Sequence, residues 1–175
     1  MVEKTRRPLV AVIGNSAAEE NVLASAEQVG RAIAGQGWNL LTGGGKGVMA
    51  AACFGFAQAK TDSAQVAVGI LPSDDQDWAN PYVDIAIPTG MGMARNAIIA
   101  RTAAGLIAVG GSSGTLSEMA LAWQFGKPLV ALQGLGGWAG ELAGRAIDDR
   151  RKDVVFAAAG AEQAVAILAK LFARS

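Results

Sequence analysis

The hydrophobic positions of this chain fall into short continuous runs, separated by longer segments in which apolar and polar residues recur at helical spacing. The runs are rich in Val, Ile and Leu, as is typical of strands that are buried on both faces. They predict strands over residues 9–13, 38–42, 66–71, 83–87, 106–109, 129–132 and 154–157. The segments between them predict helices over residues 22–34, 48–59, 94–104, 116–125, 140–147 and 161–172.

This alternation of strands and helices predicts the fold class. Buried parallel strands need helices on both faces of their sheet, so we expect a doubly wound, mostly parallel, Rossmann-like α/β fold. The chain has 175 residues, of which 51% are hydrophobic and 17% charged, which fits one compact domain. We therefore expect a single domain over residues 1–175, with residues 1–8 as a flexible N-terminus.

Small-residue turns follow four of the predicted strands, where ligands collect in such a sheet. They are Gly14-Asn15-Ser16, the loop from Gly43 to Gly47, the segment from Pro88 to Asn96, and the turn from Gly110 to Thr115. The last turn joins a buried strand to a helix, so its backbone N–H groups and the positive end of the helix dipole are offered to an anion. The sequence thus predicts a phosphate cradle at this edge.

Two charged residues are expected beside that cradle. Arg95 follows the fourth strand, and Glu118 falls in the first turn of the helix predicted to begin at residue 116. As a functional pair, the guanidinium would clamp an anion and the carboxylate would act as acid, base or hydroxyl acceptor. As a structural pair, Glu118 would cap its helix and Arg95 would pair with it.

Other motifs match the patterns of different functional sites, but each match is incomplete. Residues 45–50 read as the dinucleotide pattern G-x-G-x-x-A, but they follow the second strand and not the first. Residues 110–114 match the nucleophile elbow G-x-S-x-G at Ser112, yet the chain has no histidine to serve as base. Asp74, Asp75 and Asp77 lie in a polar stretch that lacks the pattern of a calcium loop. We predict a solvated loop there and no metal site.

The balance of charged residues limits the classes of partner that we expect. Lys plus Arg and Asp plus Glu number 15 each, so no overall field favours nucleic acid or an anionic membrane, and we expect neither as a partner. Cys53 is the one cysteine, and its neighbours predict a small buried helix residue. The chain shows no signal peptide or membrane-spanning run, and we expect a cytoplasmic protein.

The loop Gly43-Gly44-Gly45-Lys46-Gly47-Val48-Met49 and the segment from Gly110 to Glu118, in that order, resemble the Lonely Guy family, formerly labelled lysine-decarboxylase-like. The resemblance implies a Rossmann-like fold, assembly into dimers or larger oligomers, and hydrolysis of nucleoside 5′-monophosphates to a base and ribose 5-phosphate. By the family's motifs, Arg95 and Glu118 correspond to its catalytic residues. Gly111, Ser113, Gly114 and Thr115 fall on its phosphate-binding turn.

The chain departs from the enzymatic motif at three positions. Gly110 stands in the place of a proline, Ser112 in that of a glycine, and Asn96 in that of the lysine after the arginine. These departures are similar to the molybdenum-cofactor carrier-like branch of the superfamily, which binds phosphorylated molybdopterin. The implied cofactor-binding set is Gly14, Asn15, Ser16, Gly43, Gly44, Gly45, Lys46, Gly47, Arg95, Gly111, Ser112, Ser113, Gly114, Thr115 and Glu118.

The favoured hypothesis from the sequence is therefore a carrier for a phosphate-bearing heterocycle, the molybdenum cofactor. The metal would arrive with that ligand, because the chain has no ligand cluster of its own. The carrier would form a homodimer or homotetramer and exchange its cargo with molybdoenzymes or cofactor-synthesis proteins. A phosphoribohydrolase that uses Arg95 and Glu118 as catalytic residues, and a regulatory nucleotide sensor, remain the alternatives.

Overall fold

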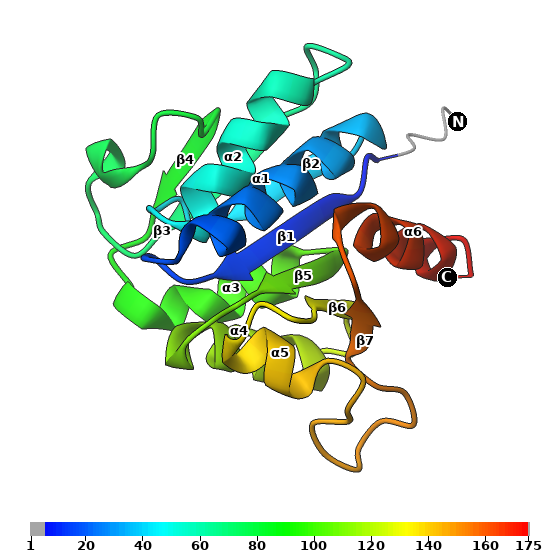
Figure 1. Cartoon of the computed structure of the whole chain (residues 1–175). Coiled ribbons are helices and arrows are strands. Elements are labelled where there is room, and N and C mark those ends of the chain that lie inside the picture. The colour runs from blue at the N-terminus through cyan, green and yellow to red at the C-terminus, as the bar shows by residue number, and fades with distance from the viewer. Residues whose placement is uncertain (1–5, 175) are drawn as a thin grey trace, which may run out of the picture.

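A computed structural model describes residues 6–174 as an open parallel sheet between two layers of helices (Figure 1). The sheet has seven strands in the order β4-β3-β2-β1-β5-β6-β7, and all of its pairings are parallel. The strands are β1 (Leu9–Gly14), β2 (Asn39–Thr42), β3 (Ala67–Leu71), β4 (Ile85–Pro88), β5 (Gly105–Val109), β6 (Leu129–Leu132) and β7 (Phe156–Ala158). This order confirms the predicted doubly wound fold.

The helices divide between the two faces of the sheet. They are α1 (Glu20–Gly35), α2 (Val48–Ala59), α3 (Asn96–Thr102), α4 (Ser113–Gln124), α5 (Gly137–Leu142) and α6 (Ala161–Phe172), with 3-10 turns η1 (Gln76–Trp78) and η2 (Gly92–Arg95). One hydrophobic core joins α1, α2 and α6 to the sheet, and a second core joins α3, α4 and α5 to the opposite face. Cys53 is fully buried in the first core, as its sequence context predicted.

The strands in the middle of the sheet are buried on both faces, but β4 at its edge is not. All five residues of β5 are buried, whereas Ile85 and Ile87 of β4 are 46% and 42% exposed. The apolar run in β4 predicted a covered strand, and the structure corrects this because no helix of the described chain covers its outward isoleucines. The stretch from residue 73 to 81, predicted as a loop, contains the short turn η1.

The start of the described chain is tied to the body of the protein. Arg7 pairs with Asp62, and the carbonyl of Pro8 accepts a hydrogen bond from the Asn39 amide at 2.9 Å. Residues 1–5, the larger part of the predicted flexible N-terminus, lie outside the described residues. None of the described helices has the length and apolar content that a membrane span requires.

Candidate functional site

A cavity of about 310 Å³ opens at the carboxyl edge of the sheet, on the face covered by α3 and α4. It lies where the strand order reverses between β1 and β5, which is where ligands bind in open α/β sheets. Its walls come from the segments after β1, β2, β3, β4 and β5. The lining residues are Val12, Ile13, Gly14, Ser16, Gly43, Met49, Pro72, Trp78, Met93, Arg95, Asn96, Ser112, Ser113, Gly114, Thr115 and Glu118.

The start of α4 forms one wall of the cavity. Gly110 and Gly111 turn the chain away from β5 with φ angles of +61° and +108°, which residues other than glycine rarely adopt. Ser112 then precedes the first helical residue, Ser113, and makes no side-chain cap. The first N–H groups of a helix have no partner within it, and residues 112–115 line the cavity, so these amides are candidates to bond a ligand there.

The helix begins three residues earlier than the sequence predicted. The expected start at residue 116 placed Glu118 in the first turn, whereas α4 starts at Ser113 and holds Glu118 in its second turn. That part of the prediction is wrong, because Ser113 and Gly114 have helical backbone despite their low helix propensity. The positive end of the helix dipole consequently lies on residues 113–115, and the Glu118 carboxylate lies in the next turn of α4.

Arg95 extends from η2 into the cavity and is only 6% exposed. It donates to the side-chain oxygen of Asn96, and its terminal nitrogen lies 3.9 Å from a Glu118 oxygen, which is an ion pair but too long for a hydrogen bond. Its Nε is buried without any hydrogen-bond partner in the described chain. A guanidinium remains charged under all ordinary conditions, so this buried donor is left unsatisfied.

Glu118 is the acidic partner of Arg95 and is 7% exposed. Burial raises the pKa of its carboxyl to about 7, and the neighbouring Arg95 charge opposes that rise only in part. Burial also lowers the pKa of the Arg95 guanidinium, with Glu118 acting in the opposite direction. Near neutral pH the carboxyl is therefore divided between its neutral and ionised forms, and it does not fully balance the arginine.

Asn96 connects this pair to the start of α4. Its side-chain oxygen accepts from Arg95, and its amide nitrogen donates to the Gly114 carbonyl at 3.3 Å. The residue that stands in place of the family's lysine thus holds the arginine through a hydrogen bond to a neutral side chain. It does not add a second positive charge to the cavity.

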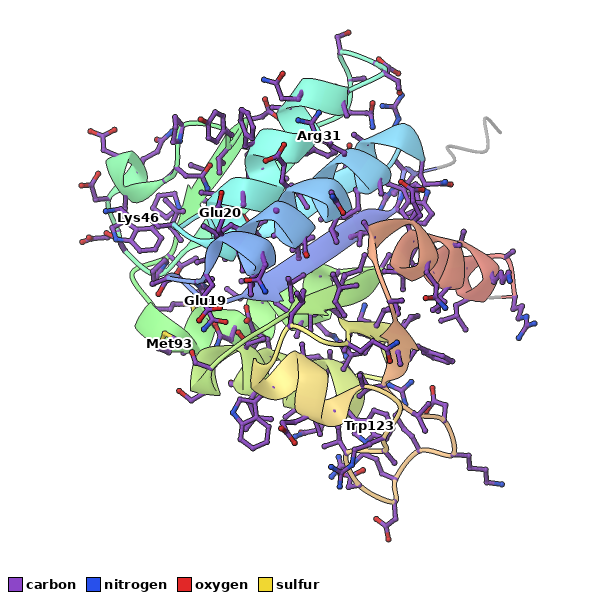
Figure 2. The ribbon with its side chains drawn as sticks, viewed as in Figure 1. Glu19, Glu20, Arg31, Lys46, Met93 and Trp123 are labelled. Carbon is purple, nitrogen blue, oxygen red and sulfur yellow. The ribbon has the colours of Figure 1, made fainter. Side chains whose placement is uncertain are left out.

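The structure brings together nine of the fifteen residues predicted to bind a cofactor. Gly14, Ser16, Gly43, Arg95, Ser112, Ser113, Gly114, Thr115 and Glu118 line the cavity. Asn15, Gly44, Gly45, Lys46, Gly47 and Gly111 do not line it. Asn15 instead accepts a hydrogen bond from the Gly111 amide, and Lys46 is exposed at the rim of the sheet edge (Figure 2).

Sequence reasoning missed the apolar side of the cavity, which is formed by Met49, Pro72, Trp78 and Met93. Figure 2 shows Met93 at the end of the molecule where the central strands end, far from Arg31 and Trp123. The available signal was Trp78, a large aromatic residue within an otherwise polar stretch. No group of three or more side chains that could hold a metal ion occurs among residues 6–174.

These features define a class, the Rossmann-like α/β proteins with a cavity at the point where the strand order reverses. Within that class, the chain belongs to the SLOG cluster4 family, whose sequence profile it matches over residues 7–167. The predicted resemblance to the Lonely Guy superfamily is thereby confirmed. An uncharacterized protein of Archaeoglobus fulgidus is 42% identical over 124 residues, which cover 71% of this chain and 79% of the relative.

Two solved structures with stated ligands are similar over nearly their whole length. The molybdenum cofactor binding protein of the phototrophic bacterium Rippkaea orientalis is 36% identical, with a TM-score of 0.84 over 96% of this chain and 99% of that one. The molybdenum cofactor carrier protein of Chlamydomonas reinhardtii is 34% identical, with a TM-score of 0.76 and the same two coverages.

Proposed function

We propose that this protein binds and carries the molybdenum cofactor, holding its phosphate at the start of α4. The single observation that carries the proposal is the buried, incompletely paired guanidinium of Arg95, which shares the cavity with the first residues of α4. The first amides of a helix have no partner within it. A buried charge without a full partner is destabilising, and a bound phosphate would satisfy it together with the helix amides. The two relatives named for this cofactor support the choice of ligand.

The cofactor supplies its own metal, so the protein needs only to hold the organic part. Arg95 and the amides of Ser113 and Gly114 would bind the phosphate, and Glu118 in its neutral form would donate a hydrogen bond. Such a carrier would receive its cargo from cofactor-synthesis proteins or deliver it to molybdoenzymes. Phosphoribohydrolase chemistry would instead require Glu118 to stabilise an oxocarbenium-like ribose.

Titration of purified protein with isolated molybdenum cofactor tests this function. We expect saturable binding by the wild-type protein and a loss of about 100-fold in affinity for Arg95→Gln, because the ligand phosphate loses its buried cation. Arg31→Gln is the matched control, since Arg31 is exposed on α1 and pairs with Glu27 of the same helix. Absence of cofactor binding, or release of free base from AMP that disappears in Glu118→Gln, would overturn the proposal.

We also propose that copies of the chain associate through the uncovered side of β4. Ile85 and Ile87 form an exposed apolar pair on this edge strand, and such a surface favours burial against another protein surface. Light scattering should give the mass of a dimer or tetramer for the wild-type protein. Ile87→Lys should shift that mass toward the monomer, and an unchanged mass would exclude this surface.

A further inference from the structure

The cavity has two chemically different ends. Arg95, Glu118 and the start of α4 form the polar end, whereas Met49, Pro72, Trp78 and Met93 bring apolar surface to the same space. Of the sixteen lining residues, Trp78 is the only aromatic one. Its side chain is 45% exposed, so a large flat apolar surface faces an open cavity. Binding of another flat ring against it would remove that surface from water.

Trp78 is fixed from behind by the glycine loop after β2. A Cβ atom at Gly45 would lie 2.7 Å from the indole Cη2 and 3.0 Å from Cζ3, so the ring rests where any side chain at position 45 would have to be. Asn80 holds the two segments together. Its side-chain nitrogen donates to the carbonyls of Gly44 and Gly45 at 3.0 Å each, and it is 8% exposed.

The turn that carries Trp78 is also ordered by its own side chains. The Asp75 carboxylate accepts from the Asp77 amide at 2.9 Å, and the Ser73 hydroxyl accepts from the Asp75 amide at 2.9 Å. The indole is thus a rigid surface presented to the cavity. A ligand ring that stacks on it would pay little ordering entropy, which favours binding by a preorganised site.

Met93 links the apolar end to the polar end. Its methyl carbon lies 3.0 Å from the position that a Cβ atom at Gly114 would take, so the thioether reaches over the first turn of α4. The side chain is 62% exposed and flexible, and methionine adapts well to flat rings of varied shape. A ligand with its anionic group on α4 would therefore extend past Met93.

We propose that Trp78 determines the specificity of this cavity by stacking on a flat heterocycle whose attached phosphate lies on α4 and Arg95. The inference rests on the proposed function and deepens it, because it assigns the ring of the ligand to a particular residue. The class of ligand is a phosphate ester of a fused nitrogen heterocycle. A sugar phosphate without a ring system would use only the polar end.

The test compares a ring-bearing probe, molybdopterin, with a ring-free probe, ribose 5-phosphate. Trp78→Ala should weaken molybdopterin binding by about tenfold, as expected for the loss of one stacking contact, and leave ribose 5-phosphate binding unchanged. Trp78→Phe should keep most of the affinity, whereas Trp78→Leu, which has bulk but no flat ring, should lose it. Trp138→Ala is the matched control, because Trp138 is 40% exposed and does not line the cavity.

Tryptophan fluorescence gives an independent reading of the same contact. Molybdopterin should quench the wild-type emission, and most of that quenching should be absent in Trp78→Phe. Equal affinity of Trp78→Ala and wild type for molybdopterin would overturn the inference while leaving the proposed function intact. Failure of the wild-type protein to bind molybdopterin would overturn the proposed function itself.

Discussion

Two glycine-rich segments leave the same edge of the sheet, the loop from Gly43 to Gly47 after β2 and the turn from Gly110 to Gly114 after β5. Their compositions are similar, but four consecutive residues at the start of α4, 112–115, line the cavity, whereas only Gly43 of the first segment does. In the first, the Gly44 amide donates to the Thr42 hydroxyl at 3.0 Å, and Asn80 occupies the Gly44 and Gly45 carbonyls. The amide of Val48, which begins α2, donates to the Asn15 carbonyl at 2.9 Å.

The comparison shows that glycine content does not by itself make a phosphate site. What matters is where the backbone N–H groups find their partners. In the loop after β2, the Gly44 amide and the Gly44 and Gly45 carbonyls bond other segments, and the loop supports Trp78. The turn after β5 leaves the start of α4 unpaired beside Arg95, where an anion can complete the hydrogen bonding.

The largest expected effect tests the supporting role of the first loop. Gly47→Ala should lower the free energy of unfolding by about 4 kcal/mol, because position 47 has φ +65° and its Cβ would lie 2.6 Å from the Ser16 carbonyl oxygen. Gly37→Ala is the control, since Gly37 has φ +74° and open space around it. It should lose only about 1 kcal/mol in denaturant unfolding. Equal losses would show that close packing at Gly47 contributes nothing.

Elements that are set by neighbouring residues could be predicted from the sequence. Elements that are set by contacts between residues far apart in the chain could not. The bounds of β6, α2 and α6 were predicted correctly, because each is a local run of apolar or helical spacing between clear breaks. The helix predicted over residues 140–147 is instead α5 at Gly137–Leu142. Its position is fixed by the Trp138 and Ala139 amides, which donate to the carbonyls of Gly111 and Gly110 at 3.0 and 2.8 Å.

The two ends of the candidate site show the same distinction between local and long-range interactions. The position of α4 directly after β5 follows from neighbouring residues, so the polar end of the cavity could be anticipated. The apolar end depends on Asn80 reaching the glycine loop more than thirty positions earlier, and no local pattern encodes that contact. The hydrogen bond from Gly111 to Asn15 joins residues still further apart in the sequence, which is why Asn15 was predicted as a ligand contact and not as a support.

The second prediction concerns Glu118, a buried acid on α4 that has no counterpart in the loop after β2. In the unfolded chain Glu118 should titrate near its ordinary value of 4.5, whereas in the folded protein its pKa is about 7. Between these values the folded state binds the extra proton, so stability should fall as pH rises, by about 1.4 kcal/mol per pH unit at most. Urea unfolding from about pH 5 to about pH 7 should show this slope in the free energy of unfolding. The same plot for Glu118→Gln should be flatter. Parallel curves would contradict the assignment.

The third prediction removes one amide without removing a side-chain charge. Ser113 is the first residue of α4, a position where proline is compatible with the helix, so Ser113→Pro deletes an N–H group that would face the phosphate. We expect about a tenfold loss of cofactor affinity with little change in stability. Ala161→Pro makes the same change at the start of α6, away from the cavity, and should leave binding as it was. Equal affinity of Ser113→Pro and wild type would mean that the amides do not hold the ligand.

The smallest expected effect tests most directly whether the two glycine-rich segments differ in their contact with the phosphate. Lys46 belongs to the loop after β2 and carries a positive charge near the sheet edge, yet it is exposed and does not line the cavity. Because water and salt screen an exposed charge, Lys46→Gln should change cofactor affinity by less than about twofold. Binding measured at low and high salt checks this, since a remote charge acts only at low ionic strength. A loss comparable to that of Arg95→Gln at both salt concentrations would mean that the loop after β2 contacts the phosphate directly, and the distinction between the two segments would fail.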